Sequence, residues 1–572
     1  MMNDNASVPG GLDRRTFMGY FAGMGLSSTL LPGVLWGKIA EGAEITSETI
    51  ACAEEIAGIE LSAEQREVIL EDIRQQREQI EALHRVPIPN DVPPALLFNP
   101  VLPGMRPGAE ERGRMTRSRV ALRERPGNLE ELAFLPVAEL SEMVRRRRVS
   151  SMELTRMYLD RIRRHDPALH AVVTVTEERA LRQAQAADEE IRRGRYRGPL
   201  HGIPWGAKDL LAVQGYPTTW GVELYREQML EGDATVVERL DRAGAVLVAK
   251  LTLGELAWGD VWFGGMTRNP WKVDQGASGS SAGPGAATAA GMIGFSIGSE
   301  TLGSISSPST RSGVTGLRPT FGRVPRTGAM ALSWTMDKLG PMCRSAEDCA
   351  LVFGSIYGPD GQDLTVHQAP FSWDARVSPR QLRIGFFQKA FERDSTEYAS
   401  KPFDLATLDV LRSLGANLIP VELPELPYNT MSLILSAEAG AAFDEYTRAG
   451  HVDRMVRQGR NTWPTVFRAA HFIPAVDYIN ANRVRTMAMH AWAELFQNLD
   501  VIVTPTSAPN QLLATNLTGH PALILPNGFR EDGTPVSITF LGDLFGESKI
   551  LALGHAYQSA TDFHRRQPAL PG

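Results

Sequence analysis

GASGSSAGPGAATAAGMIGFSIGSETLGSISSPSTRSGVTGLRPT, residues 276–320, is a stretch dominated by glycine, serine, alanine and threonine. Such a composition is typical of a flexible linker. An apolar run nevertheless passes through its middle, from Ala287 to Ile297, and a linker has no reason to carry one. The sequence therefore predicts a buried segment in which small residues allow close approach of the backbone.

Serine hydroxyls lie on both sides of this apolar run. Ser280 and Ser281 precede it, and Ser304, Ser306 and Ser307 follow it. A reactive centre is one interpretation of these two clusters. The alternative is a tightly packed helix and strand whose serines satisfy nearby backbone groups, and composition alone favours this plainer interpretation.

A second segment shifts the balance towards a reactive centre. Residues 198–213 read GPLHGIPWGAKDLLAV, in which 203–207 predicts a short apolar strand that ends at Lys208. A lone lysine usually lies in solvent. A lysine at the edge of a core loses hydration, which lowers the pKa of its amine enough to make it a base.

Together the two segments resemble the amidase signature family of serine hydrolases. That family carries a lysine after a Gly-Ile-Pro strand, a Gly/Ser-rich turn, the motif Gly-Ser-Asp-Thr-Gly-Gly-Ser and a Gly-Leu-Lys-Pro-Thr tail. The corresponding residues here are 202–208, 278–283, 298–304 and 316–320. The resemblance extends from about Leu129 to the C-terminus. It implies an α/β fold with a mixed central β-sheet sandwiched by helices.

The resemblance also implies roles for individual residues. Ser304 corresponds to the nucleophile, Lys208 to the base, and Ser280 to a bridging serine that follows a cis peptide bond. Ser280 lies 24 residues before Ser304, which is the offset expected in this family. Ser281 corresponds to a partner that orients these three side chains.

The chemistry of these residue types supports the same assignment. A serine hydroxyl is a weak nucleophile, so it needs a base that removes its proton and later returns it to the leaving nitrogen. A neutral Lys208 acting through the Ser280 hydroxyl could do both without a histidine. The negative charge that develops on the carbonyl oxygen needs preorganised donors. The sequence offers the backbone N–H groups of Thr301, Leu302, Gly303 and Ser304.

Three positions depart from the family pattern. Leu302 stands in place of a glycine, Glu300 in place of an aspartate, and Ser306 at a position that commonly holds an arginine. A backbone donor does not depend on its side chain, so Leu302 keeps the oxyanion role provided that its φ is negative. We expect a narrower site, with Arg311 as the nearest candidate partner for Glu300.

A competing pattern is present in the same turn. Residues 279–283 satisfy G-x-S-x-G, which would make Ser281 the nucleophile of an α/β-hydrolase. A buried strand should precede such an elbow, but residues 269–275 are polar and include Pro270. The glycines also suggest a phosphate loop, but no Gly-Lys-Ser/Thr follows them.

Composition limits the cofactors and partners. The chain has 572 residues, of which 43% are hydrophobic and 22% charged, and a net charge of −7. These values indicate a soluble globular protein and do not indicate nucleic-acid binding. Three cysteines are too few for a disulfide framework, and no Cys/His cluster predicts a structural metal. We expect no cofactor, a small-molecule amide substrate and no stable membrane span in the mature protein, and leave a homodimer open.

The N-terminus resembles a twin-arginine export signal, which we assign to residues 1–43. Arg14 and Arg15 precede a weakly apolar, glycine-containing run over 19–36. The pattern predicts export, with the bacterial periplasm as the destination. A frayed cytosolic terminus or an uncleaved membrane anchor is the alternative, and without a signal the location would be the cytoplasm.

Two further regions follow the signal. Residues 44–127 predict a helical and proline-rich extension, in which Ser62 opens a helix with a capping box. The catalytic domain is expected over 128–572, where Ser150 and Asp233 each predict a helix start.

The substrate pocket is expected between residues 369 and 498. Seven aromatic residues in this region could line it, although aromatic residues at such spacing more often belong to an ordinary core, which we favour. They are Tyr428, Phe443, Tyr446, Trp463, Phe467, Phe472 and Tyr478.

We therefore predict an exported serine amidase that hydrolyses a carboxamide C–N bond through an acyl-enzyme on Ser304. Fold and triad do not define a pocket, so the substrate stays open. The alternatives are a carbamate or ester hydrolase of the same family and the amidase subunit of the tRNA-dependent glutamine amidotransferase, which releases ammonia from glutamine. A non-catalytic binding module would show a broken triad, whereas Lys208, Ser280 and Ser304 are all present.

Overall fold

The structure is a computed structural model that describes residues 45–86, 115–121, 123–394, 396 and 398–570. The export signal predicted at 1–43 lies outside the described residues. So does the proline-rich part of the extension, from Pro87 to Pro107.

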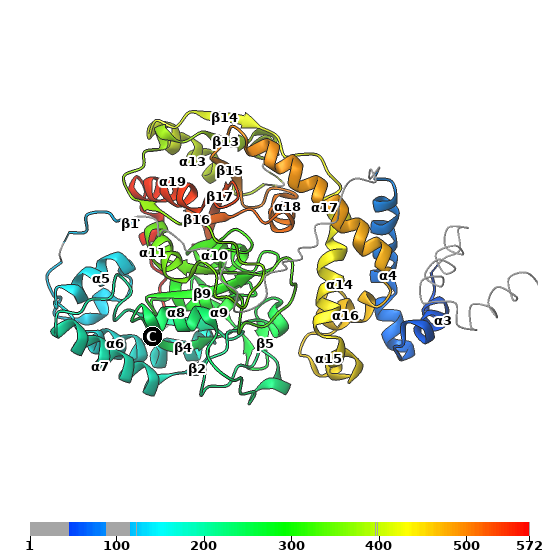
Figure 1. Cartoon of the computed structure of the whole chain (residues 1–572), viewed down its shortest axis with the longest axis horizontal. Helices are drawn as coiled ribbons and strands as arrows, with labels where there is room; N and C mark the ends of the chain where they lie inside the picture. The colour runs from blue at the N-terminus through cyan, green and yellow to red at the C-terminus, as the bar shows by residue number, and fades with distance from the viewer. Residues whose placement is uncertain (1–44, 87–114, 122, 395, 397, 571–572) are drawn as a thin grey trace, which may run out of the picture.

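An eleven-stranded sheet runs through the catalytic part of the chain (Figure 1). From one edge to the other its strands are β14 (Leu418–Val421), β13 (Ile384–Phe387), β15 (Val501–Pro505), β17 (Pro535–Gly542), β16 (Ala522–Phe529), β10 (Thr315–Arg318), β11 (Lys338–Cys343), β9 (Phe295–Glu300), β3 (Pro204–Lys208), β4 (Val246–Leu251) and β2 (Val172–Val175). Strands β9, β3 and β4 run parallel, whereas β11 runs antiparallel to β9 and to β10. The predicted mixed sheet is confirmed.

Helices cover both faces of this sheet, as the apolar run at the start of β4 predicted. Successive side chains of a strand point to opposite faces. Leu247 accordingly packs with one group of helices, and Val246 and Val248 pack with another. The first group includes α8 (Thr235–Arg242) and α11 (Ala346–Ile356); the second includes α6 (Ser151–Leu169), α7 (Glu177–Arg192) and α9 (Ala282–Ala289).

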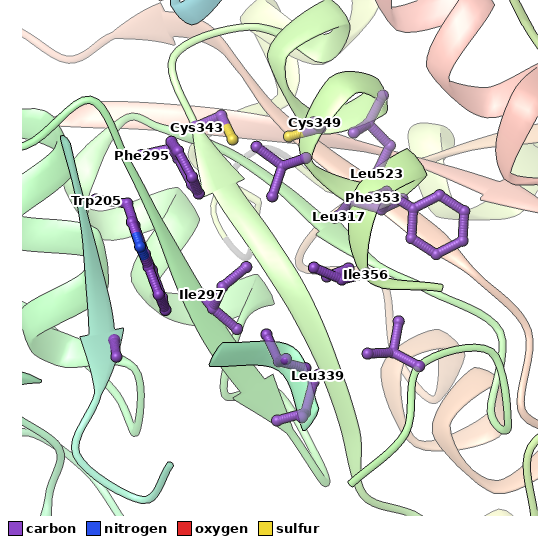
Figure 2. Packing of buried hydrophobic residues seen from close by; sticks show 14 of the residues in the cluster. Trp205, Phe295, Ile297, Leu317, Leu339, Cys343, Cys349, Phe353, Ile356 and Leu523 are labelled. Atoms are coloured by element: carbon purple, nitrogen blue, oxygen red, sulfur yellow. The ribbon is translucent and has the colours of Figure 1, made fainter. Parts of the chain in front are cut away.

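Strand β3 lies inside the sheet, and all of its residues are buried. Its Trp205 stacks on Phe295 of β9 at a ring-centroid distance of 6.0 Å (Figure 2). Because β3 and β9 are parallel neighbours, their carboxyl ends meet at the same edge. That edge, which we call the reactive edge, brings Lys208 at the end of β3 towards residues 301–304 after β9.

The glycine- and serine-rich stretch is buried, as predicted. Every residue of α9 is buried, and Ile297 of β9 has no exposed surface. Helix α10 (Ser306–Ser312) continues the stretch and leads into β10. The stretch is thus a helix, a central strand and a second helix rather than a linker.

Two of the three predicted helix starts are confirmed. Ser62 caps α4 (Ala63–His84) and Ser150 caps α6, each through a capping box. The prediction for Asp233 was wrong, because α8 begins at Thr235 without a side-chain cap. The Asp233 carboxylate instead accepts hydrogen bonds from Arg179 and from the backbone N–H of Gln214, and the charged guanidinium is the stronger partner.

The N-terminal helices α3 (Ser47–Ala57) and α4 pack against a helical unit inserted between β14 and β15. This unit comprises α14 (Leu433–Ala442), α15 (Asp444–Arg448), α16 (Trp463–Ala470) and α17 (Ala475–Phe496). Isoleucines of the extension, Ile69 among them, form an apolar cluster with Ala469 of α16. None of the described helices combines the length and the apolar composition needed to cross a membrane.

Candidate active site

Lys208 lies at the centre of the reactive edge. Its Nζ donates to the hydroxyl oxygens of Ser280 at 2.8 Å, Ser281 at 3.0 Å and Ser299 at 2.9 Å. The side chain has no exposed surface. Burial lowers the pKa of Lys208 well below its usual value, and the negative charges of Asp337 and Glu300 oppose this shift only in part. The amine is therefore suited to act as a neutral base.

The three hydroxyl groups around Lys208 are not equivalent. Ser281 donates its own proton to the backbone carbonyl of Ser299 at 3.1 Å and accepts from the Ser299 N–H at 3.2 Å. It can therefore only accept from the amine. A neutral amine has two N–H groups and one lone pair, so Ser281 takes one N–H and leaves the lone pair for another hydroxyl. Ser280 is placed to donate its proton to that lone pair.

Ser299 is a polar contact of Lys208 that sequence reasoning missed. It belongs to the quoted motif, but we assigned it no role. Its position on β9, the parallel neighbour of β3, was the available signal, since the end of that strand lies beside Lys208. The sheet order that makes them neighbours is not visible in the sequence.

The turn that carries Ser280 follows the family expectation. The Gly279–Ser280 peptide bond is cis. A Cβ added to Gly279 would lie 1.8 Å from the carbonyl oxygen of Gly259, so the position requires glycine. The backbone N–H of Ser281 donates to the Ser304 carbonyl at 3.1 Å, which ties the turn to the second serine cluster.

Ser304 retains 8% of its surface exposed, against 1% for Ser280 and none for Ser281. Its hydroxyl forms no hydrogen bond with any residue that the structure describes. The strand that precedes Ser281, β8 (Lys272–Gly276), pairs with β7 (Arg268–Asn269) in a separate two-stranded sheet. An α/β-hydrolase elbow would instead follow a strand of the central sheet and expose its serine. This geometry favours Ser304 over Ser281 as the nucleophile.

The loop over residues 301–304 presents backbone donors next to Ser304. Within the described residues, none of its four N–H groups has a hydrogen-bond acceptor in the protein. Gly303 adopts φ 87°, which glycine favours, whereas Leu302 has a negative φ. The condition set for Leu302 is thus met, and the loop can serve as an oxyanion hole.

Glu300 is paired with Arg318 rather than with Arg311, so the predicted partner was wrong. Arg318 Nη1 donates to Glu300 Oε1 at 2.8 Å, and both side chains are buried. Arg311 lies on the exposed side of α10 and donates to Gln275. The nearer residue in sequence is therefore the more distant one in the fold, because the buried end of β10 brings Arg318 to the end of β9.

Glu300 also fixes the start of α10. Its Oε2 accepts from the backbone N–H groups of Ile305 and Ser306, both at 2.8 Å, and from the Ser306 hydroxyl at 2.9 Å. Burial alone would raise the pKa of Glu300, but the Arg318 charge and these hydrogen bonds hold it at about 2. An ionised Glu300 therefore holds the backbone immediately after Ser304.

A second carboxylate anchors the loop between β10 and β11. Thr301 donates its hydroxyl proton to Asp337 at 2.6 Å, and Asp337 also accepts from the N–H groups of Leu332 at 2.8 Å and Ser333 at 3.0 Å. We expected residues 333–341 near the active site, and this contact places them there.

Two cavities lie beside the reactive edge. One of about 230 Å³ is lined in part by Ser299 and Thr301. The other, of about 580 Å³, is lined in part by Phe443 and Tyr446. The remaining five aromatic residues that we considered behave as the core alternative predicted or make structural contacts: Trp463 and Phe467 are buried, Tyr428 bonds Trp492, Tyr478 bonds Glu438, and Phe472 packs on the N-terminal helices.

Comparisons with known proteins agree with this geometry. The family model described as "Amidase" matches residues 153–514. The chain is 34% identical over 487 residues to one of the subunits of the glutamyl-tRNA(Gln) amidotransferase of Acinetobacter baumannii, covering 77% of this chain and 99% of that protein. Among solved structures, a peptide amidase from Stenotrophomonas maltophilia is 30% identical with a TM-score of 0.67, covering 77% of this chain and 100% of that one. An amidase family protein from Bacillus anthracis is 26% identical with a TM-score of 0.69, covering 77% and 94%.

Proposed function

The chain belongs to the amidase signature family of C–N hydrolysing enzymes, and from this membership we propose that it hydrolyses a carboxamide through an acyl-enzyme on Ser304. One observation carries the assignment of residues: the buried Lys208 amine is held by three serine hydroxyls, of which Ser280 can pass it a proton. A buried amine with a lowered pKa is the base that such a serine needs.

The proposed reaction has two halves. Neutral Lys208 accepts the Ser280 proton while Ser280 accepts the Ser304 proton, and Ser304 Oγ bonds to the carbonyl carbon. The N–H groups of residues 301–304 hold the resulting oxyanion. The proton then returns through Ser280 to the leaving nitrogen as the C–N bond breaks. A water molecule, activated by the same lysine, hydrolyses the ester on Ser304.

Two functional classes within the family stay in competition. The matched relative is one component of an amidotransferase, whereas the matched solved structures include a peptide amidase. We favour a free-standing amidase, because the predicted export signal would remove the chain from tRNA. Carbamates and esters are further candidate substrates of the same acyl-transfer chemistry.

A substrate panel separates these classes. We expect the purified chain alone to release ammonia from N-acylated amino acid amides at least tenfold faster, in kcat/KM, than from glutamine, a ratio of the size that pocket contacts provide. Carbamate and ester analogues of the best amide complete the panel. Turnover of glutamine that requires the other components of an amidotransferase would contradict the amidase assignment.

We further propose export to the periplasm by the twin-arginine route, which rests on Arg14 and Arg15 ahead of the weakly apolar run. We expect the chain in the periplasmic fraction of a bacterial host that has this pathway. The double variant Arg14→Lys, Arg15→Lys should remain in the cytoplasm. A parent chain found in the cytoplasm would contradict export.

A further inference from the structure

The larger cavity is walled by aromatic rings from three separate segments. Trp220 and Tyr225 come from the loops after β3, Phe443 and Tyr446 from the start of the α15 region, and Trp334 from the loop before β11. Trp220 contacts Tyr225 at 5.0 Å and Phe443 at 6.4 Å between ring centroids, with the rings nearly perpendicular. We call this cavity the aromatic chamber. Its volume of about 580 Å³ lies in the range of small-molecule sites.

The aromatic chamber adjoins the smaller cavity at the reactive edge. Ala329, Met330, Ala331 and Trp334 line both cavities. The smaller cavity also touches Ser299, whose hydroxyl binds Lys208. Residues 329–334, which we call the divider, thus lie between the reacting groups and the chamber. A substrate that extends past the divider would place its remote end among the rings.

The divider is fixed at both ends, so the chamber exists before a ligand binds. The N–H of Met330 donates to the Leu210 carbonyl at 3.0 Å, two residues after Lys208. At the other end, Ser333 donates to Glu438 of α14 at 2.6 Å. A preformed pocket spares a ligand the cost of ordering it.

The charges on the chamber wall are few and peripheral. Apart from tyrosine hydroxyls, the ionisable side chains that line it are Glu445, which is exposed, and His451. Leucine, methionine and alanine side chains fill the wall between the rings. An ammonium or carboxylate group placed among these rings would lose hydration without gaining a buried counter-charge. A flat apolar group would bury its surface and contact ring edges and faces.

We propose that the aromatic chamber binds an aromatic or similarly large apolar group of the amide substrate, remote from the scissile bond. This inference rests on the proposed amidase function and narrows its substrate class to extended amides. It also separates the chain from enzymes that act on a small polar amide such as glutamine. Phe443 and Tyr225 are specificity-determining residues in this proposal, with no part in proton transfer.

The test compares ω-phenylalkanamides with alkanamides of the same chain length. We expect the terminal ring to raise kcat/KM at least about tenfold for one chain length in the parent enzyme, a ratio of the size that apolar pockets provide. Phe443→Ala should remove most of this ratio while changing kcat/KM for the alkanamide less than about twofold. Phe529→Ala, which truncates a ring that lines neither cavity, is the matched control and should keep the ratio.

A second variant guards against a folding defect, since Phe443 also stacks on Phe467. Ala449 lines the chamber and is exposed, so Ala449→Trp adds a ring inside the chamber without removing a core contact. It should lower the ring preference as Phe443→Ala does. Equal rates for both amide series in the parent, or a stronger preference for an ω-trimethylammonio amide, would overturn the proposal. Failure of the amidase function itself would appear differently, as no turnover of any amide together with no labelling by a fluorophosphonate.

Discussion

A Ser304→Ala variant is expected to hydrolyse carboxamides about 10⁶-fold more slowly than the parent, the loss seen when the nucleophile of a serine hydrolase is removed. The remaining rate would come from substrate binding and from the N–H groups of residues 301–304, which do not depend on the Ser304 side chain. The variant should bind a substrate amide with little change in affinity. Steady-state kinetics and labelling with a fluorophosphonate, followed by peptide mapping, measure the two effects.

Two serine variants make this test specific. Ser307→Ala removes a hydroxyl three residues further along, which forms no hydrogen bond with the described residues, and it should keep full labelling and near-parental kcat. Ser281→Ala should keep the label on Ser304 and lose activity only through the orientation of Lys208. If the label lay on Ser281 and survived in Ser304→Ala, an elbow-type hydrolase would replace the proposed mechanism.

The reactive edge could be predicted because its residues lie in short motifs with strong local signals. The apolar strand before Lys208 and the serine-rich turns around the buried run each fold as the sequence indicated. Lys208 and Ser280 then meet as the family resemblance implied. Local pattern and resemblance sufficed here, since each prediction concerned one segment or a pair of segments already known to meet.

The errors came from contacts that only the sheet order decides. Arg318 reaches Glu300 from a strand two places away in the sheet, and no local pattern distinguishes it from Arg311. Ser299 reaches Lys208 because β9 adjoins β3. Asp233 has a good helix-capping position in sequence, but Arg179 on another helix takes its carboxylate. In each case a long-range charge or strand pairing outweighed a local preference.

The helical unit shows the same limit for the substrate pocket. Phe443 and Tyr446 line the aromatic chamber, whereas Trp463 and Phe467 a short distance along the chain are core residues. Spacing alone cannot separate these roles, because all four rings are largely buried and touch one another in a chain of ring contacts. The distinction depends on Trp220 and Trp334, which come from elsewhere in the sequence and enclose the chamber.

Lys208→Met should lower kcat for amide hydrolysis about 10⁴-fold, the upper range for loss of a general acid–base group. Methionine is unbranched and similar in length, so it keeps the packing and removes the amine. In the parent, kcat/KM should rise tenfold per pH unit below the folded-state pKa of Lys208 and level off above it. That plateau begins below the usual pKa of lysine, because burial lowers the pKa of this amine. A profile that follows a group with the pKa of histidine, and that persists in Lys208→Met, would contradict the mechanism.

The same substitution has an opposite consequence for stability, which separates a catalytic loss from a folding defect. Since the pKa of Lys208 is lower in the folded than in the unfolded chain, the folded state binds fewer protons. The parent's free energy of unfolding should therefore rise with pH between the folded and the unfolded pKa, and below that interval the buried amine is a constant cost. Burial lowers the pKa of Lys250 and Lys338 as well, so only the difference between parent and Lys208→Met isolates this group. Urea unfolding at several pH values should show the variant's advantage over the parent shrinking as pH rises through this interval, whereas exposed Lys389→Met should parallel the parent throughout. A Lys208→Met chain that is inactive and also much less stable than the parent at neutral pH would mean that the amine is a structural group, charged in the folded protein.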